Sequence, residues 1–173
     1  MEYKEIRADY DDRHITVYQA YSPAIADAAV AAGRFVPPFE AGRMTWIKPS
    51  FRWMVYRCGW ARKPGQERVL AVRITRDGFD RAVRDAVSSS AITTGKPDIR
   101  VQWDPERDLH HQPLDHRSIQ IGLAGRASDA YVHEWTAGIT DITPLVREIH
   151  GHVVAGDLDR ARHLLPLERP YPL

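Results

Sequence analysis

The sequence predicts an α+β fold, in which helices flank a mixed or antiparallel central sheet. Segments that alternate apolar and polar residues, as half-buried strands do, are interspersed with segments at helical spacing, without a regular βαβ repeat. The chain has 173 residues, 43% of them hydrophobic and 27% charged, which is enough for one core and short for two. We therefore expect residues 1–173 to form a single globular domain.

The first elements predict a strand that turns directly into a helix. Apolar and polar residues alternate over residues 14–21, which places Gln19 and Tyr21 on one face of a strand. Ser22 is followed by a proline, a common start of a helix, and small apolar residues at helical spacing continue until Gly33.

A short strand and a second helix are expected next. Residues 43–48 are predicted to form the strand, and Ser50 can cap the helix. One face of this helix is apolar. The other carries Trp53, Arg57 and Trp60 at spacings of four and three.

Strands dominate the middle of the chain, and helices its end. Residues 69–75 are β-rich, and a helix is expected over residues 79–86. Residues 99–104 and 118–123 alternate and predict two strands that each have one polar face. The last predicted helices are opened by Ser128, which starts a helix through Trp135, and by Thr143 and Asp157.

Charge and cysteine content exclude several classes of protein. The formal net charge is +1, without the global basic excess of a histone-like nucleic-acid binder. Cys58 is the only cysteine, which excludes an intramolecular disulfide and a zinc site built on several thiolates. The N-terminus lacks the apolar segment of a signal peptide, and no apolar run could span a bilayer. We expect a cytoplasmic protein with no membrane partner.

The most unusual local feature is a basic and aromatic block from Arg43 to Arg68. No acidic residue occurs between Arg43 and Gln66. Guanidinium and ammonium groups suit phosphate oxygens, and flat aromatic rings suit nucleic-acid bases. The alternative is that the arginines pair with acidic residues elsewhere and the tryptophans belong to the core. We expect a phosphate-bearing ligand here, with Arg43 and Lys48 as the catalytic residues.

Polar residues outside the block complete the candidate site. Gln19, Gln102 and Gln120 lie in predicted strands, and their amides could converge on a ligand. Alternatively, Gln102 and Gln120 face water on the polar sides of their strands. The candidate ligand-binding residues are Tyr18, Gln19, Thr45, Trp46, Ser50, Arg52, Arg57, Trp60, Lys63 and Gln120.

No metal site is expected. The three histidines between residues 110 and 116 lack HExxH or comparable spacing. The acidic residues that alternate over 104–108 lack the glycine and the distal glutamate of a calcium loop. The motifs GxGxxG, GxxxxGK[ST], GxSxG and KxDG are also missing, which argues against Rossmann, P-loop, hydrolase and classical nucleotidyl-ligase proteins.

Several sequence blocks resemble those of one known family. They are RADYDD, VYQAYSP, FVPP, RMTWIKPSFRWMVYRCGW, KPGQERVLAV, VQWDPERD and RSIQIGLAG, and they cover nearly the whole chain. On these blocks the chain is identified as a member of the domain of unknown function 4291 family. That name implies no activity.

A second resemblance is to ADP-ribosyltransferase-like domains, through the order of elements in ITVYQAYSPAIADAAVAAGRF and MTWIKPSFRWM. Such domains usually have His or Arg where this chain has Gln19, and Glu134 is the available candidate for their catalytic glutamate. A branch that removes a 2′-phosphate from RNA works with basic residues instead. That resemblance implies a similar role for Arg43, Lys48, Arg52 and Arg57, and NAD as a candidate cofactor.

Two hypotheses about function remain. The first is an enzyme, such as a transferase, that acts on a nucleotide, NAD-like or RNA phosphate-bearing ligand, with a ring stacked on Tyr18, Trp46 or Trp60. Positive charge would stabilise a pyrophosphate leaving group or phosphoryl oxygens. The second is a non-catalytic RNA or single-stranded DNA binding module on the same surface. A closed pocket favours the first, and an open basic groove favours the second.

Overall fold

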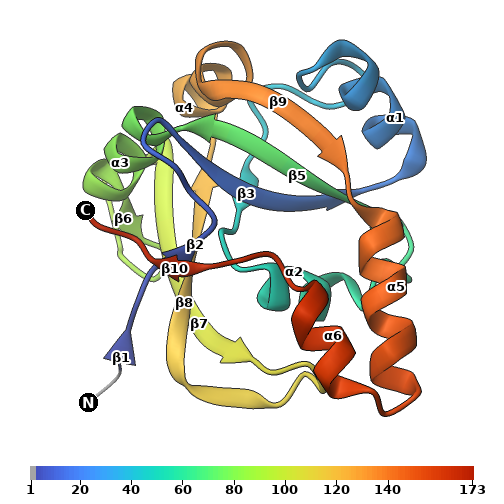
Figure 1. Cartoon of the computed structure of the whole chain (residues 1–173). Coiled ribbons are helices and arrows are strands. Elements are labelled where there is room, and N and C mark those ends of the chain that lie inside the picture. The colour runs from blue at the N-terminus through green and yellow to red at the C-terminus, as the bar shows by residue number, and fades with distance from the viewer. Residues whose placement is uncertain (1–2) are drawn as a thin grey trace.

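Strands and helices are interspersed in the computed structural model, which describes residues 3–173 (Figure 1). The longer strands are β3 (His14–Tyr21), β5 (Arg68–Thr75), β7 (Ile99–Arg107), β8 (Pro113–Leu123) and β9 (Thr136–Asp141). The short strands are β1 (Tyr3–Lys4), β2 (Arg7–Ala8), β4 (Thr45–Ile47), β6 (Val87–Ser88) and β10 (Arg169–Pro170). The helices are α1 (Pro23–Ala32), α2 (Phe51–Cys58), α3 (Arg76–Asp85), α4 (Gly125–Ala130), the π-helical turn η1 (Tyr131–Trp135), α5 (Thr143–Val154) and α6 (Leu158–Leu164). The predicted α+β fold class is confirmed.

Two sheets contain most of the strands. In the first, β3, β5 and β9 are antiparallel neighbours in that order. In the second, β8 pairs with antiparallel β7 along one edge and with antiparallel β4 and parallel β1 along the other, while β6 extends the sheet beyond β7. Figure 1 shows the first sheet crossing the top of the molecule below α1 and α4, and β7 and β8 running downward from it.

The two sheets are joined where β3 passes the end of β4. The Tyr18 amide donates a hydrogen bond of 2.7 Å to the carbonyl oxygen of Lys48, and the two residues form an isolated antiparallel bridge. Because β4 also pairs with β8, this bridge ties the first sheet to the second. The junction therefore brings together segments that are far apart in the sequence.

Apolar side chains form two buried clusters. One lies between the sheets and includes Ile15 and Val17 of β3 with Ile121 of β8. The other packs Tyr18 of β3 against Phe51 and further residues of α2 and α5. Alternate residues of β3 thus face different clusters, because successive side chains of a strand point to opposite faces.

The helix starts follow local capping chemistry in most cases. Ser22, Ser50 and Asp157 cap α1, α2 and α6 as predicted, and each side chain accepts a hydrogen bond from the amide three residues later. The prediction for Ser128 is wrong. Helix α4 begins after Ala124, directly beyond the end of β8, so Ser128 lies buried inside the helix. None of the helices within residues 3–173 is both long and apolar enough to cross a membrane.

Helix α2 ends in an uncommon left-handed turn. Gly59, Trp60 and Ala61 have φ of 60°, 58° and 63°. Trp60 therefore lies beyond the helix and does not share a face with Trp53 and Arg57, so that prediction is wrong. A left-handed conformation costs a residue with a side chain about 1–2 kcal/mol. The turn must be stabilised by its surroundings, and Trp60 is 5% exposed.

Candidate functional site

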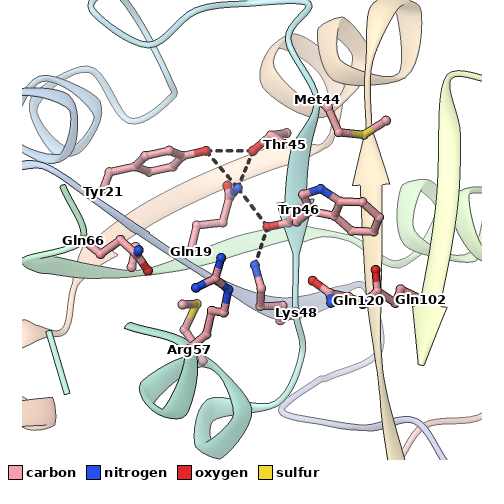
Figure 2. A pocket seen from close by; sticks show the side chains of 12 residues that line it. Gln19, Tyr21, Met44, Thr45, Trp46, Lys48, Arg57, Gln66, Gln102 and Gln120 are labelled. Carbon is pink, nitrogen blue, oxygen red and sulfur yellow. Dashed lines mark hydrogen bonds between the residues drawn. The ribbon is translucent and has the colours of Figure 1, made fainter. Parts of the chain in front are cut away.

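A polar cavity of about 430 Å³ lies at the junction of the two sheets (Figure 2). It is lined by Gln19, Ala20, Tyr21, Met44, Thr45, Trp46, Lys48, Met54, Arg57, Gln66, Gln102 and Gln120. None of these residues is acidic, whereas Lys48 and Arg57 are basic. The volume is within the range of small-ligand sites. The charge of the lining favours an anion.

Lys48 is buried at the end of β4, with 7% of its surface exposed. Its ammonium donates a hydrogen bond of 3.0 Å to the carbonyl oxygen of Trp46 and lies 5.7 Å from the ring centroid of Trp53. Burial, together with the nearby charge of Arg57, lowers the pKa of Lys48 from 10.5 to about 7. The amine therefore gains and loses a proton near neutral pH, as acid–base catalysis requires.

Helix α2 presents Arg57 to the same cavity. The Ser50 hydroxyl accepts from the Trp53 amide at 3.0 Å and donates to Glu106 Oε2 at 2.7 Å, which fixes the start of the helix. Near its end, Lys63 Nζ donates to the carbonyl oxygen of Arg57 at 2.8 Å. Within the part of the chain that the structure describes, the Arg57 guanidinium has no hydrogen bond or ion pair. It is therefore free to bind a ligand.

The side-chain amide of Gln19 forms its hydrogen bonds with other residues of the protein. Its Nε2 lies 2.5 Å from the Thr45 hydroxyl, 3.1 Å from the Tyr21 hydroxyl and 3.1 Å from the carbonyl oxygen of Trp46 (Figure 2). Its Oε1 accepts from the Tyr131 hydroxyl at 2.6 Å. The Tyr21 and Thr45 hydroxyls are 2.7 Å apart, so one donates to the other. One hydroxyl proton remains to donate to a ligand, and Gln19 acts by positioning the two hydroxyls.

Lys48, Gln120 and Gln102 form a row across three strands. Gln102 pairs directly with Gln120, and the register of β4 with β8 continues to place Lys48 beside Gln120. Figure 2 shows the three side chains following one another across the sheet. Gln120 is 8% exposed, so it does not merely face water. The three glutamines considered from the sequence do line one cavity.

Asp104 lies beside these amides and was missed by sequence reasoning. Gln102 Nε2 donates to its Oδ1 at 3.0 Å, and Gln120 Nε2 donates to its Oδ2 at 2.6 Å. The alternation of β7 places Asp104 and Gln102 on one face, which was the signal available in the sequence. The contact with Gln120 depends on strand register, which the sequence alone does not show.

Trp46 packs close to β8 because Gly122, its partner in the register, has no side chain. A Cβ at position 122 would lie 2.7 Å from the Met44 sulfur and 3.0 Å from the Trp46 ring. We expect Gly122→Ala to push both side chains toward the cavity and to lower the free energy of unfolding by about 1–2 kcal/mol. Urea denaturation would measure this loss.

The control for Gly122→Ala is Gly138→Ala in β9. A Cβ at position 138 would meet nothing within 4 Å. Its effect on stability should be small, because no neighbouring atom has to move. Equal stabilities of the two variants would contradict the packing role of Gly122.

Arg43, the second predicted catalytic residue, lies outside this cavity. Its side chain is 76% exposed and pairs with Glu40 at 3.3 Å. It lines a neighbouring hollow of about 340 Å³, which shares Tyr21, Met44 and Thr45 with the cavity. The structure therefore does not place Arg43 and Lys48 in one hollow.

Several predicted binding residues also lie away from the cavity lining. Tyr18 is 2% exposed, and its ring packs edge-on against Phe51. The Trp60 ring is stacked with the rings of His111 and His150, with centroid distances of 5.2 and 5.0 Å. Of the three predicted stacking rings, Trp46 lines the cavity. The predicted binding residues outside it are Tyr18, Ser50, Arg52, Trp60 and Lys63.

No group of three or more His, Cys, Asp and Glu residues within 3–173 is arranged to hold a metal ion. The histidines between residues 110 and 116 make other contacts. His111 stacks on Trp60, and His116 lies in β8.

The fold and the cavity define an α+β protein with a polar pocket between two sheets, lined by Lys48 and Arg57 and by no acidic residue. The chain belongs to the family described as Domain of unknown function (DUF4291), whose profile matches residues 5–171. The predicted family membership is confirmed. The comparison with curated proteins found no match. The family match does not support the resemblance to ADP-ribosyltransferase-like domains, and Glu134 is exposed and does not line the cavity.

Proposed function

We propose that the protein is an enzyme that acts on a nucleotide-like, phosphate-bearing molecule bound between the two sheets. One observation carries the proposal: the cavity holds a buried lysine and an unpaired arginine, and no carboxylate lines it. Burying a cation is unfavourable unless negative charge compensates it. The nearby charge of Asp104 only partly offsets the effect of burial on Lys48. A bound anion would add negative charge, and phosphate oxygens accept hydrogen bonds from both ammonium and guanidinium groups.

We expect Lys48 to act on the bound molecule. With a pKa of about 7 the amine is partly neutral near pH 7, and a phosphate beside it would favour the charged form. The ammonium of Lys48 and the guanidinium of Arg57 would then stabilise negative charge on a phosphoryl or pyrophosphate oxygen as its bond breaks. Lys48 could also donate a proton to that oxygen and regain one from water.

The remaining lining suits a nucleoside. The amides of Gln66, Gln102 and Gln120 offer hydrogen-bonding groups, and the Trp46 ring offers an apolar face. NAD is a candidate ligand on the same grounds, because it carries both phosphates and nucleosides.

The alternative of a non-catalytic RNA or single-stranded DNA binding module receives less support. Such modules stack bases on exposed aromatic rings along a basic groove. Trp53 is 6% exposed and Trp60 5%, and the Trp60 ring is stacked with His111 and His150. The aromatic residues of the basic block therefore do not offer a continuous stacking surface.

We expect Lys48→Met to weaken binding of AMP, GMP or NAD about 10- to 100-fold, because a hydrogen bond from a charged group contributes about 1.5–3 kcal/mol. The variant keeps the apolar stem and removes a buried charge, so its stability should not fall. Isothermal titration calorimetry would measure binding.

The control is Lys96→Met. Lys96 is an exposed lysine that does not line the cavity. Its loss should leave the affinity unchanged. The proposal is wrong if none of the three nucleotides binds the parent protein. It is also wrong if single-stranded RNA binds tightly with a slope of log K against log salt near −0.7 per phosphate for several contacts.

A further inference from the structure

We infer that Asp104 sets the ligand selectivity of the cavity by turning two glutamine amides so that their carbonyl oxygens select a ligand with two adjacent hydrogen-bond donors. This inference rests on the proposed function and narrows its substrate class. The class is a nucleoside phosphate that presents either the two hydroxyls of a ribose or the paired N–H groups of a guanine-type edge.

The orientation of the amides follows from the acceptor between them. An ionised carboxylate accepts hydrogen bonds and donates none. Gln102 and Gln120 therefore turn their NH₂ groups toward the two oxygens of Asp104, at 3.0 and 2.6 Å. Because the oxygen and the nitrogen of an amide point in different directions from the same carbon, an amide whose NH₂ group faces Asp104 turns its carbonyl oxygen elsewhere. No hydrogen bond within residues 3–173 occupies either oxygen, and both residues line the cavity.

The two oxygens lie side by side because the residues that carry them are direct partners across β7 and β8. Side chains in such a pair have Cβ atoms about 5 Å apart. A ligand that offers two donors on neighbouring atoms satisfies both oxygens. A ligand that offers an acceptor or an apolar group there leaves one of the oxygens without a hydrogen bond. Such a ligand should bind much more weakly, because an unpaired polar group is costly.

The position of Lys48 in the same row fits this assignment. Neighbouring strands lie about 4.8 Å apart, so the strands that carry Lys48 and Gln102 are about 10 Å apart. One nucleotide can span that distance, with its phosphate at Lys48 and its paired donors at Gln120 and Gln102. The acceptors and the cations thus recognise opposite ends of one molecule.

The experiment compares AMP, GMP and their 2′-deoxy forms by calorimetry with the parent protein and with Asp104→Asn. If the ribose is recognised, 2′-deoxy-AMP should bind at least about 10-fold more weakly than AMP. If a guanine edge is recognised, 2′-deoxy-GMP should bind at least about 10-fold more tightly than 2′-deoxy-AMP. In Asp104→Asn either preference should fall below about 3-fold, because the asparagine NH₂ must be accepted by one glutamine oxygen, which then leaves the cavity.

Asp129→Asn is the matched control, because Asp129 is exposed on α4 and does not line the cavity. It should keep the parent's preference. Gln102→Met removes one of the two amide oxygens but keeps the Asp104 carboxylate and its hydrogen bond from Gln120. This variant should lose the preference too, so a folding defect in Asp104→Asn alone cannot account for the result.

A parent protein without either preference, or an Asp104→Asn variant that keeps the preference, overturns the inference. The proposed function survives that outcome if Lys48→Met still weakens binding of all four nucleotides. If the parent protein binds none of them, the proposed function and the inference both fail.

Discussion

Replacing Glu168 with glutamine is expected to raise the free energy of unfolding at pH 9 by about 3 kcal/mol and to change it little at pH 4. Glu168 lies near the C-terminus, and its Oε2 accepts a hydrogen bond of 2.9 Å from the Phe51 amide at the start of α2. Burial raises the pKa of this carboxyl from 4.5 to about 8, and the charge of Glu106 acts in the same direction. Glutamine can accept the same hydrogen bond without a charge.

The direction of this change in stability follows from the number of protons that the folded and unfolded states bind. The pKa of Glu168 is higher in the folded state than in the unfolded state, so the folded state binds more protons between pH 4.5 and about 8. The stability of the parent protein therefore decreases as the pH rises through this window. Glutamine removes that decrease. The expected 3 kcal/mol is below the full effect of the shift, because the residue remains partly exposed.

Urea denaturation of both proteins from pH 4 to pH 9 would measure the difference. Glu134→Gln is the control, because Glu134 is an exposed glutamate on η1. Its pH profile should run parallel to that of the parent protein. A parallel profile for Glu168→Gln would instead mean that the Glu168 carboxyl is already ionised at neutral pH in the folded protein.

Local chemistry made much of the fold predictable. The caps at Ser22 and Ser50 need a side chain and an amide three residues apart, so the sequence contains the whole interaction. The alternation in β3 likewise placed Gln19 and Tyr21 together, and their side chains are hydrogen-bonded. Such features depend on neighbours in the sequence alone.

The site was less predictable, because it depends on how distant strands pair. Asp104 can be assigned a role once β7 and β8 are aligned, since its contact with Gln120 crosses between them. Arg43 is close to Lys48 in the sequence, yet it precedes β4 and lines another hollow. The basic residues between Arg43 and Arg68 do not form one surface, because Arg43 lines a different hollow from Lys48 and Arg57.

Gly59 indicates in the sequence where helix α2 ends. Glycine commonly ends helices in a left-handed conformation, as it does here with a φ of 60°. A helix that ends there cannot carry Trp60 on the same face as Arg57. Helical spacing therefore overestimated the number of rings available to a ligand.

We expect Trp60→Ala to lower the free energy of unfolding by about 3–5 kcal/mol, the usual cost of removing a buried aromatic side chain. The ring is 5% exposed and is stacked with the rings of His111 and His150. Alanine carries nearly the same backbone penalty at the φ of 58°, so the difference reports the loss of the side chain. Urea denaturation would measure it.

Binding measurements on the same variant show whether Trp60 supports the fold or contacts the ligand. Trp60→Ala that is still folded should bind AMP or GMP with the parent affinity, because the ring does not line the cavity. Trp46→Ala should show the reverse pattern, a smaller loss of stability and a clear loss of affinity, because Trp46 lines the cavity and is only half-buried. If folded Trp60→Ala loses affinity while Trp46→Ala keeps it, the ligand lies on the far side of α2, and the cavity between the two sheets is not the site.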